Sequence, residues 1–154
     1  MNWGSYLAFG IIKPSHPKII YHMCITNEYN QQIKENNIYY PPTYQQDGFI
    51  HATADPSLLL SIGTYFYKND LNDWICLEID TEKLISPVKY EPAAPVGSTP
   101  TKPQDQSKPE PLFPHIYGGI NPESVTVKYN IVRSLDGSFH SIDGLVSELG
   151  NLTL

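Results

Sequence analysis

A proline-rich segment between residues 92 and 114 constrains the fold more than any other stretch of this sequence. It holds seven of the chain's 14 prolines, with Gly, Ser, Thr and Gln among the residues between them. Proline has no N–H to donate and a fixed φ, so the segment can form neither a helix nor a central strand. Its composition also buries too little apolar surface to offset the entropy lost on ordering. We therefore expect residues 92–112 to form an extended or disordered loop inserted between two strands.

The chain as a whole has the size and composition of one domain. Its 154 residues, 40% of them hydrophobic, can bury a single core. We expect the domain over residues 19–140, an N-terminal extension over residues 1–18 and a C-terminal tail over residues 141–154. Residues 1–12 are apolar but lack the basic start of a signal peptide, and no run reaches the ~18 apolar residues of a membrane span. These features predict a soluble cytoplasmic protein without a membrane partner, and they leave the oligomeric state open.

Hydrophobic periodicity predicts an α+β fold. Thr26 offers an N-cap for a polar helix that ends near Asn36, and Asp55 with Pro56 begins a second helix with a core-facing apolar stripe. The dipeptide Asp-Gly at 136–137 predicts a hairpin. Strands are expected over residues 18–24, 73–80, 88–91 and 125–132.

Three tyrosines, Tyr39, Tyr40 and Tyr44, surround two prolines in a stretch that cannot continue a helix. They could pack in the core. They could also form an aromatic wall beside a pocket, because loops on rigid scaffolds often carry binding residues. The sequence leaves both alternatives open.

Charge and cysteine content narrow the classes of partner. The formal net charge is -6 and Arg133 is the only arginine, whereas nucleic-acid readers depend on arginine clusters that neutralise phosphates. We therefore expect no nucleic-acid partner. Cys24 and Cys76 each lie in an apolar run without a paired ligand spacing, so we expect two buried, reduced thiols.

Two segments place a histidine on the face of a short apolar strand. In the first, residues 47–53, the alternation of a strand puts Phe49, His51 and Thr53 on one face. In the second, Phe113, His115 and Tyr117 alternate in the same way. Each histidine follows an aromatic residue by two positions and a Gly or Pro turn. We therefore expect the two histidines to be neighbours at one partly buried pocket.

A carboxylate and further polar side chains complete the candidate site. Glu91 ends the strand predicted before the proline-rich segment. The first strand contributes a further polar side chain near the site, either Tyr21 or His22. Two histidines and one carboxylate could form a metal triad. The three come from distant segments without a local H-x-H pair, so we expect no metal. The buried thiols make a Cys–His nucleophile less plausible, and the chain has no glycine-rich phosphate cradle.

A structural role for these histidines is the competing interpretation. Buried polar groups generally find hydrogen-bond partners, so a histidine on an apolar strand face is commonly a core residue bonded to backbone. The matched surroundings of His51 and His115 are what favour a functional pair.

Several motifs of the chain together resemble the family called domain of unknown function 952. The resemblance covers roughly residues 19–139. Its motifs are D-G-F-I-H-A-T at 47–53, L-E-I-D at 77–80, Y-E at 90–91, F-P-H-I-Y-G at 113–118 and V-R-S-L-D-G-S-F at 132–139.

The resemblance implies a small single α+β domain with two short mixed or antiparallel sheets and two main helices. That fold is similar to ADP-ribosyltransferases and the related RNA 2′-phosphotransferases, in which a nucleotide such as NAD could sit in a cleft between the sheets. His51, Glu91 and His115 match the family's polar signature and are the catalytic candidates. Phe49, Thr53, Tyr117 and Tyr21 are the binding candidates, with Phe113 beside them. The stretch between Glu91 and Phe113 is longer and richer in proline than the family pattern, which affects the rim of the pocket.

Three functions follow as hypotheses. The first is an ADP-ribosyltransferase-like enzyme acting on NAD or a related nucleotide, with Glu91 at a ribose hydroxyl or a developing oxocarbenium ion and His115 as orienting group, acid or base. The second is a non-catalytic domain that binds a small metabolite. The third is an interaction module that uses the proline-rich loop.

Overall fold

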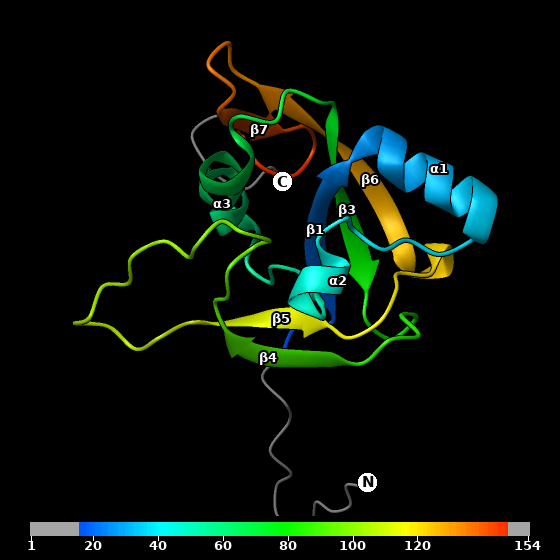
Figure 1. The fold of residues 1–154 in the computed structure, drawn as a ribbon, viewed down its shortest axis with the longest axis horizontal. Helices are drawn as coiled ribbons and strands as arrows, with labels where there is room; N and C mark the ends of the chain where they lie inside the picture. Colours follow the sequence, from blue (N-terminus) through cyan, green and yellow to red (C-terminus); the bar gives the residue numbers. More distant parts are fainter. Residues whose placement is uncertain (1–15, 148–154) are drawn as a thin grey trace, which may run out of the picture.

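A four-stranded antiparallel sheet forms one half of the fold in the computed structural model, which describes residues 16–147. The strand order is β1-β3-β6-β7 (Figure 1). β3 lies between β1 and β6, and all but one of its residues are buried, as the continuous apolar run predicted. The bounds are β1 (Ile19–Ile25), β3 (Trp74–Asp80), β6 (Val125–Arg133) and β7 (Phe139–Ile142).

A smaller antiparallel sheet, in the order β2-β5-β4, lies beside the first. Its strands are β2 (Ile50–His51), β5 (Leu112–Ile116) and β4 (Val88–Pro92). β4 pairs directly with β5, so the proline-rich segment is an insertion between two strands, as predicted. The prediction of an α+β domain with two short sheets is confirmed, and both sheets are antiparallel.

The helices begin close to where the sequence signals them. They are α1 (Thr26–Asn36), α2 (Tyr44–Asp47) and α3 (Leu59–Tyr67), with short 3₁₀ turns η1 (Pro56–Leu58) and η2 (Pro122–Ser124). Asp55 caps η1 by accepting a hydrogen bond from the Ser57 N–H, as the Asp-Pro pair predicted. The N-cap of α1 is Ile25, and Thr26 is the first helical residue, so the predicted Thr26 cap is wrong.

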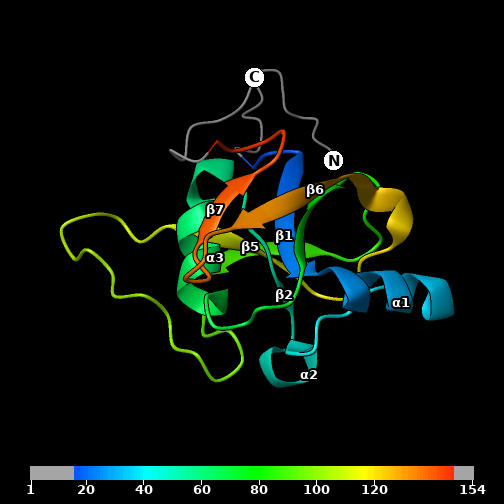
Figure 2. The same cartoon turned by 90° about the horizontal axis from the view of Figure 1, so that it is seen from above.

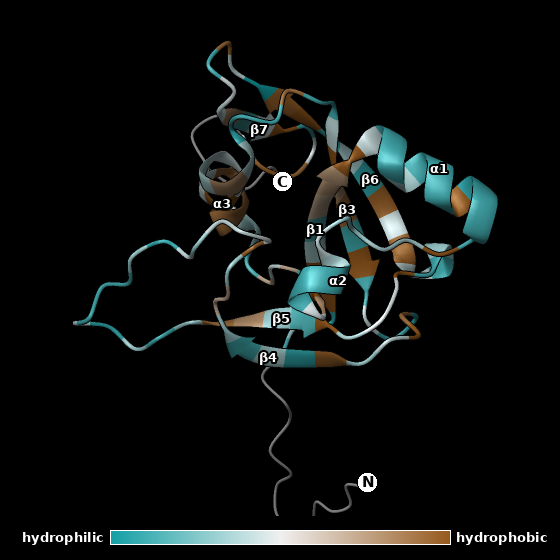
Figure 3. Ribbon diagram, in the orientation of Figure 1, coloured by the Kyte–Doolittle hydropathy of each residue, from teal (hydrophilic) through white to brown (hydrophobic). Residues whose placement is uncertain are grey.

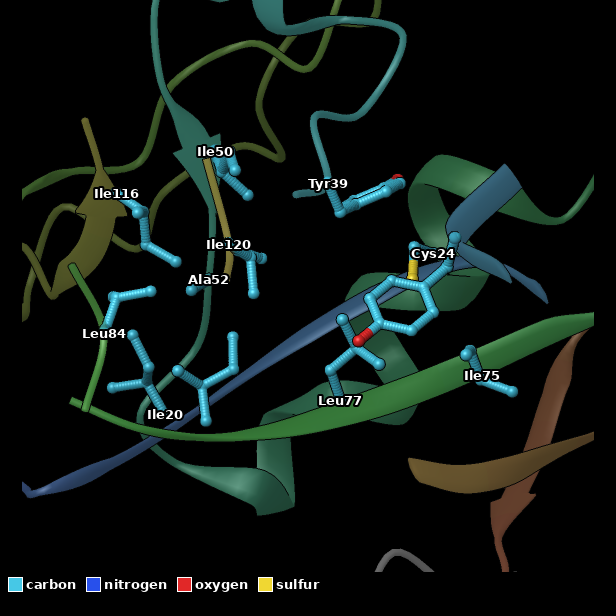
Figure 4. Close-up of a cluster of buried hydrophobic side chains, with 12 residues drawn as sticks. Ile20, Cys24, Tyr39, Ile50, Ala52, Ile75, Leu77, Leu84, Ile116 and Ile120 are labelled. Atoms are coloured by element: carbon cyan, nitrogen blue, oxygen red, sulfur yellow. The ribbon is translucent and has the colours of Figure 1, made fainter. Parts of the chain in front are cut away.

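The larger sheet separates two clusters of buried side chains. One face of β1 and β3 presents Ile20, Ile75 and Leu77 toward the small sheet, where Ile50 and Ile116 meet them (Figure 4). The opposite face packs against α3 and β7 through a second cluster that includes Trp74, Cys76 and Phe139. β1, β3 and α3 are largely apolar, whereas α1 is largely polar (Figure 3). The alternation of side chains in β1 and β3 therefore builds both cores from the same strands.

Three local predictions need correction. The stretch predicted as an extended loop contains Tyr44, which begins the short helix α2. The strand predicted over residues 49–53 has only two ladder residues, because the chain leaves the small sheet after His51 and pairs Thr53 with Tyr21 of β1. The proline-rich loop is partly packed, since Ala93, Ala94 and Val96 line a cavity.

The boundaries of the domain lie partly outside the part of the chain that the structure describes. Of the expected N-terminal extension, residues 1–15 are outside it, and Lys18 lies 3.6 Å from Asp80. Of the expected C-terminal tail, residues 148–154 are outside it, while Leu145 and Val146 are buried in the second cluster. No helix among residues 16–147 is long and apolar enough to cross a membrane.

α3 lies beside β7 (Figure 2), and the close contact between them makes Gly63 of α3 sensitive to substitution. A Cβ at Gly63 would lie 2.2 Å from the ring of Phe139, which packs beside the stacked rings of Trp74 and Tyr67. Alanine would gain up to about 1 kcal/mol in helix propensity but overpack the core by about 1–3 kcal/mol. We expect Gly63→Ala to lower the free energy of unfolding by about 1 kcal/mol in urea titrations. The double variant with Phe139→Leu should recover part of the loss, and a more stable single variant would contradict this packing.

Candidate functional site

A cavity opens where the edge of β1, the small sheet, α3 and the proline-rich segment meet. It encloses about 80 Å³ and its walls are mostly apolar. β1 is an edge strand of its sheet, and Thr53 pairs with its outer edge through two backbone hydrogen bonds to Tyr21. The lining includes His22 and Met23 of β1, His51, Ile62 and Phe66 of the α3 side, Val96 of the loop, and Phe113 and His115 of β5.

His51 and His115 come together at this cavity. They are directly paired residues of β2 and β5, and their ring centroids are 5.6 Å apart at an angle of 73°. Antiparallel pairing puts paired side chains on the same face, so the register of these two strands makes the rings neighbours. Both residues line the cavity, as the two matched motifs predicted.

Glu91 is bound by two side chains of β5 and its continuation. His115 Nδ1–H donates to Glu91 Oε1 at 2.8 Å, and the Tyr117 hydroxyl donates to the same oxygen at 2.5 Å. These bonds, from Tyr117 first and His115 second, lower the pKa of the Glu91 carboxyl, so the group is ionised at neutral pH. Since the carboxylate occupies Nδ1, the Nε2 of His115 is the nitrogen left for a ligand or a proton.

The ring of Phe49 covers the imidazole of His115. It stacks on His115 with centroids 4.0 Å apart at 20°, and it also contacts His51 and Tyr117. The side chain of His115 is consequently only 3% exposed, whereas that of His51 is 18% exposed. Of the two imidazoles, His51 is the more accessible.

Asp47 holds His51 from the end of α2. Its Oδ2 lies 2.8 Å from His51 Nε2, and both carboxylate oxygens lie 3.1 Å from the backbone N of Gly97 in the proline-rich segment. An ionised carboxylate only accepts, so the His51 Nε2 carries the proton and Nδ1 has the free lone pair. Burial lowers the pKa of His51, although Asp47 opposes the shift, so this imidazole is neutral at neutral pH.

His22 joins the two sheets beneath the cavity. Its Nδ1–H donates to the backbone carbonyl of His51 at 2.6 Å, and its Nε2 is buried without a hydrogen-bond partner among the described residues. Burial lowers the pKa of His22 to about 4, so the ring is neutral at physiological pH. The ring therefore supports the position of His51 through the backbone.

A second cavity of about 160 Å³ adjoins the first and shares His22, His51 and Val96 with it. Tyr39 lines the second cavity and is also only 1% exposed, so this tyrosine both packs in the core and forms part of a pocket wall. Tyr40 and Tyr44 are absent from the lining of this cavity. Neither cavity has a lysine or arginine among the residues that line it, and the second has Glu28 and Asp70. The two acidic side chains and the lack of a lining cation disfavour an anionic group inside the second cavity.

The remaining candidates occupy different positions around this site. Thr53 is buried in the wall of the first cavity, where its backbone bonds tie it to β1. Tyr21 lines the same cavity, but its side chain packs in the second core cluster. Arg133 donates to the carbonyl oxygens of Tyr67, Lys68 and Asp70 and so closes the end of α3.

Sequence reasoning missed Asp47 and only named His22 as an alternative to Tyr21. Alternation along β1 would have favoured His22, because it lies between Ile20 and Cys24 on the face toward the small sheet. Asp47 gives no comparable signal, since an aspartate before glycine is ordinary turn chemistry.

The possible metal ligands and the two cysteines have defined positions in the structure. Among residues 16–147, no group of three or more His, Cys, Asp or Glu side chains is arranged to hold a metal ion. Cys24 and Cys76 are both free and buried, as predicted, and burial raises the pKa of both thiols.

Comparisons with known proteins identify relatives of this fold. The crystal structure of protein CC0527 from Caulobacter crescentus matches with a TM-score of 0.60 and 20% identity, covering 79% of this chain and 92% of that protein. Its solution NMR structure matches with a TM-score of 0.56 and 19% identity, covering 79% and 91%. At this identity the likeness concerns the fold alone, and no curated protein matches the chain. The model of the family described as "Protein of unknown function (DUF952)" matches residues 24–128, and the chain therefore belongs to this family.

Proposed function

We propose that the cavity binds a nucleotide or a related small metabolite, and that the protein is an ADP-ribosyltransferase-like enzyme acting on NAD or a similar compound. The observation that carries this proposal is the ionised Glu91, which accepts hydrogen bonds from His115 and Tyr117. His115 lines the cavity together with His51, whereas Glu91 and Tyr117 lie outside its lining. Carboxylates placed beside a sugar carbon are the groups that stabilise oxocarbenium-like transition states.

The chemistry assigned to these residues is transfer of a ribosyl group. The bond between the anomeric carbon and the base nitrogen breaks, and its electron pair leaves with the base. The negative charge of Glu91 stabilises the positive charge that develops on the ribose. An acceptor hydroxyl or water then forms the new bond to the anomeric carbon, and its proton passes to the free lone pair of His51 Nδ1, the more exposed imidazole.

The charge distribution determines how such a ligand would lie. The base, which has a flat apolar face, enters the cavity, where no lysine or arginine is present and Phe66 and Phe113 line the walls. The phosphates stay outside near Lys89, whose Nζ lies 5.0 Å from the centroid of the Tyr117 ring on the Glu91 side of β4. The ribose then lies at the mouth of the cavity between these two regions.

The burial of His115 beneath Phe49 favours a second candidate, a non-catalytic metabolite-binding domain. In that case the His115–Glu91 pair fixes the shape of the cavity and no bond is broken. Binding and turnover measurements separate the two candidates.

We expect calorimetry to show binding of NAD and nicotinamide mononucleotide, and chromatography to show release of nicotinamide. The double variant His51→Ala/His115→Ala should lose turnover by at least about 100-fold, because general acid–base groups contribute factors of this order. His140→Ala, on β7, is the matched control and should behave as wild type. Binding without any product would establish the non-catalytic alternative, and the absence of both binding and product would refute both candidates.

A further inference from the structure

Asp47 contacts two parts of the molecule that are far apart in the sequence. It is the last residue of α2, and Gly48, with φ of 83°, turns the chain from this helix into β2. Its side chain is only 5% exposed. Among the described residues, its carboxylate accepts hydrogen bonds from His51 Nε2–H and from the backbone N–H of Gly97, and no lysine or arginine pairs with it. A buried carboxylate depends on such donors, because each lost bond leaves charge unsolvated.

The first contact determines which nitrogen of His51 is available. Because Nε2–H donates to Asp47, the lone pair is on Nδ1, and the ring cannot rotate without breaking this bond. The same imidazole lines both cavities. Asp47 thereby sets the orientation and the tautomer of a residue to which we assign proton transfer.

The second contact holds a wall of the cavity. Val96 and Thr99 exchange two backbone hydrogen bonds, which close a tight turn around Gly97. Gly97 has φ of 56°, and a Cβ there would lie 3.2 Å from Thr43 Cγ2, so this turn is formed by glycine close to the start of α2. Ala93, Ala94 and Val96 line the first cavity, while most of the segment beyond them is exposed. Residues 93–97 therefore form a wall of the cavity that the Gly97 N–H ties to the carboxylate of Asp47.

We propose that Asp47 is a positioning residue that couples closure of the wall, residues 93–97, over the cavity to the orientation and tautomer of His51. When the wall is closed, the Gly97 N–H and the His51 N–H together satisfy the carboxylate. When the wall opens for a ligand to enter or leave, Asp47 loses one donor and gains access to water, and its hold on His51 weakens. The site is thus assembled for proton transfer only when the cavity is closed. The catalytic meaning of this coupling rests on the proposed function, but the coupling itself does not.

The test uses two readouts that need no turnover: the imidazole ¹⁵N shifts of His51, which report its tautomer, and amide hydrogen exchange at residues 93–97. In Asp47→Asn, the new amide N–H donates to His51 Nε2, so the proton should move to Nδ1. The Gly97 N–H can still donate to the amide oxygen, but this bond is no longer charge-assisted, so the Gly97 amide should exchange about tenfold faster. Asp105→Asn, in the exposed part of the same loop, is the matched control and should change neither readout.

A second variant tests the coupling from the side of the wall. Gly97→Ala strains the positive φ and leaves Asp47 in place, so exchange at residues 93–97 should rise and the His51 ring should show a mixture of tautomers. Faster exchange in Gly97→Ala with an unchanged His51 tautomer would overturn the coupling. Unchanged tautomer and exchange in Asp47→Asn would overturn the role of Asp47. If Asp47→Asn does not fold, the Gly97→Ala result decides alone. Loss of the proposed enzymatic activity would leave these measurements unaffected, so the two proposals fail separately.

Discussion

Replacing Glu91 by glutamine is expected to lower kcat/KM for nicotinamide release by about 100- to 1,000-fold, the range found when a charge-stabilising group is removed from an active site. Glutamine has nearly the same shape, and its carbonyl oxygen can still accept from His115 Nδ1–H and from the Tyr117 hydroxyl. The substitution therefore removes the negative charge and leaves the arrangement of the rings. The lowered pKa of Glu91 means that the wild-type carboxylate carries that charge throughout the neutral range.

The control for this prediction is Glu110→Gln, which removes one negative charge from the exposed part of the proline-rich loop. It should retain full activity. Tyr117→Phe removes one of the two donors to Glu91 and should cause an intermediate loss of about tenfold, because the His115 bond remains. A Glu91→Gln variant with more than half of the wild-type activity would show that the charge of Glu91 takes no part in the reaction.

The free energy of unfolding is expected to fall by about 2 kcal/mol between pH 7 and pH 5 because of His22. The pKa of His22 is about 4 in the folded protein and near its ordinary value of 6.5 in the unfolded chain. As the pH falls below 6.5, the unfolded state binds a proton that the folded state does not, so stability present above pH 6.5 is lost progressively down to about pH 4. His51, whose pKa is also lowered, contributes in the same direction.

The measurement is urea unfolding at pH 7, 6 and 5 for the wild type and for His22→Gln. Glutamine can still donate to the carbonyl of His51 but does not titrate, so most of the pH dependence should disappear. The linkage to His22 is disproved if the slope of stability against pH is the same in His22→Gln and wild type.

Local sequence signals were sufficient for most of the elements. The continuous apolar run before Asp80 predicted that β3 is a central strand. Asp55 with Pro56 predicted the turn that leads into α3. Both signals act within a few residues, since a cap bonds to backbone two residues away and a strand reveals its burial by its own side chains. The short helix α2 was missed because four residues carry no measurable periodicity.

The pairing of the two histidines was also predictable, but their partners were predictable only in part. The matched surroundings of His51 and His115 pointed to one pocket, and Glu91 was a candidate because it ends the strand predicted before the proline-rich segment. The contact of Asp47 with both His51 and Gly97 joins residues 50 positions apart, and nothing near Asp47 in the sequence signals it. The packing of residues 93–97 was likewise not predictable. A proline-rich composition indicates the entropy lost on ordering the segment, but it does not indicate which contacts offset that loss.

The likeness to ADP-ribosyltransferases, the nucleotide ligand and the cytoplasmic location stay predictions. The fold itself is that of the family to which the chain belongs, and the two matched structures share it at low identity.

The sequence alone determined the strands, the two main helices, the insertion point of the proline-rich segment and the two histidine faces, because periodicity, caps and prolines act over a few neighbouring residues. Tertiary structure alone decided that Asp47 would hold His51, that His22 would support it from another sheet, and that residues 93–97 would wall the cavity. These contacts depend on the register between strands and on how the loop folds back, and both are properties of the whole folded chain.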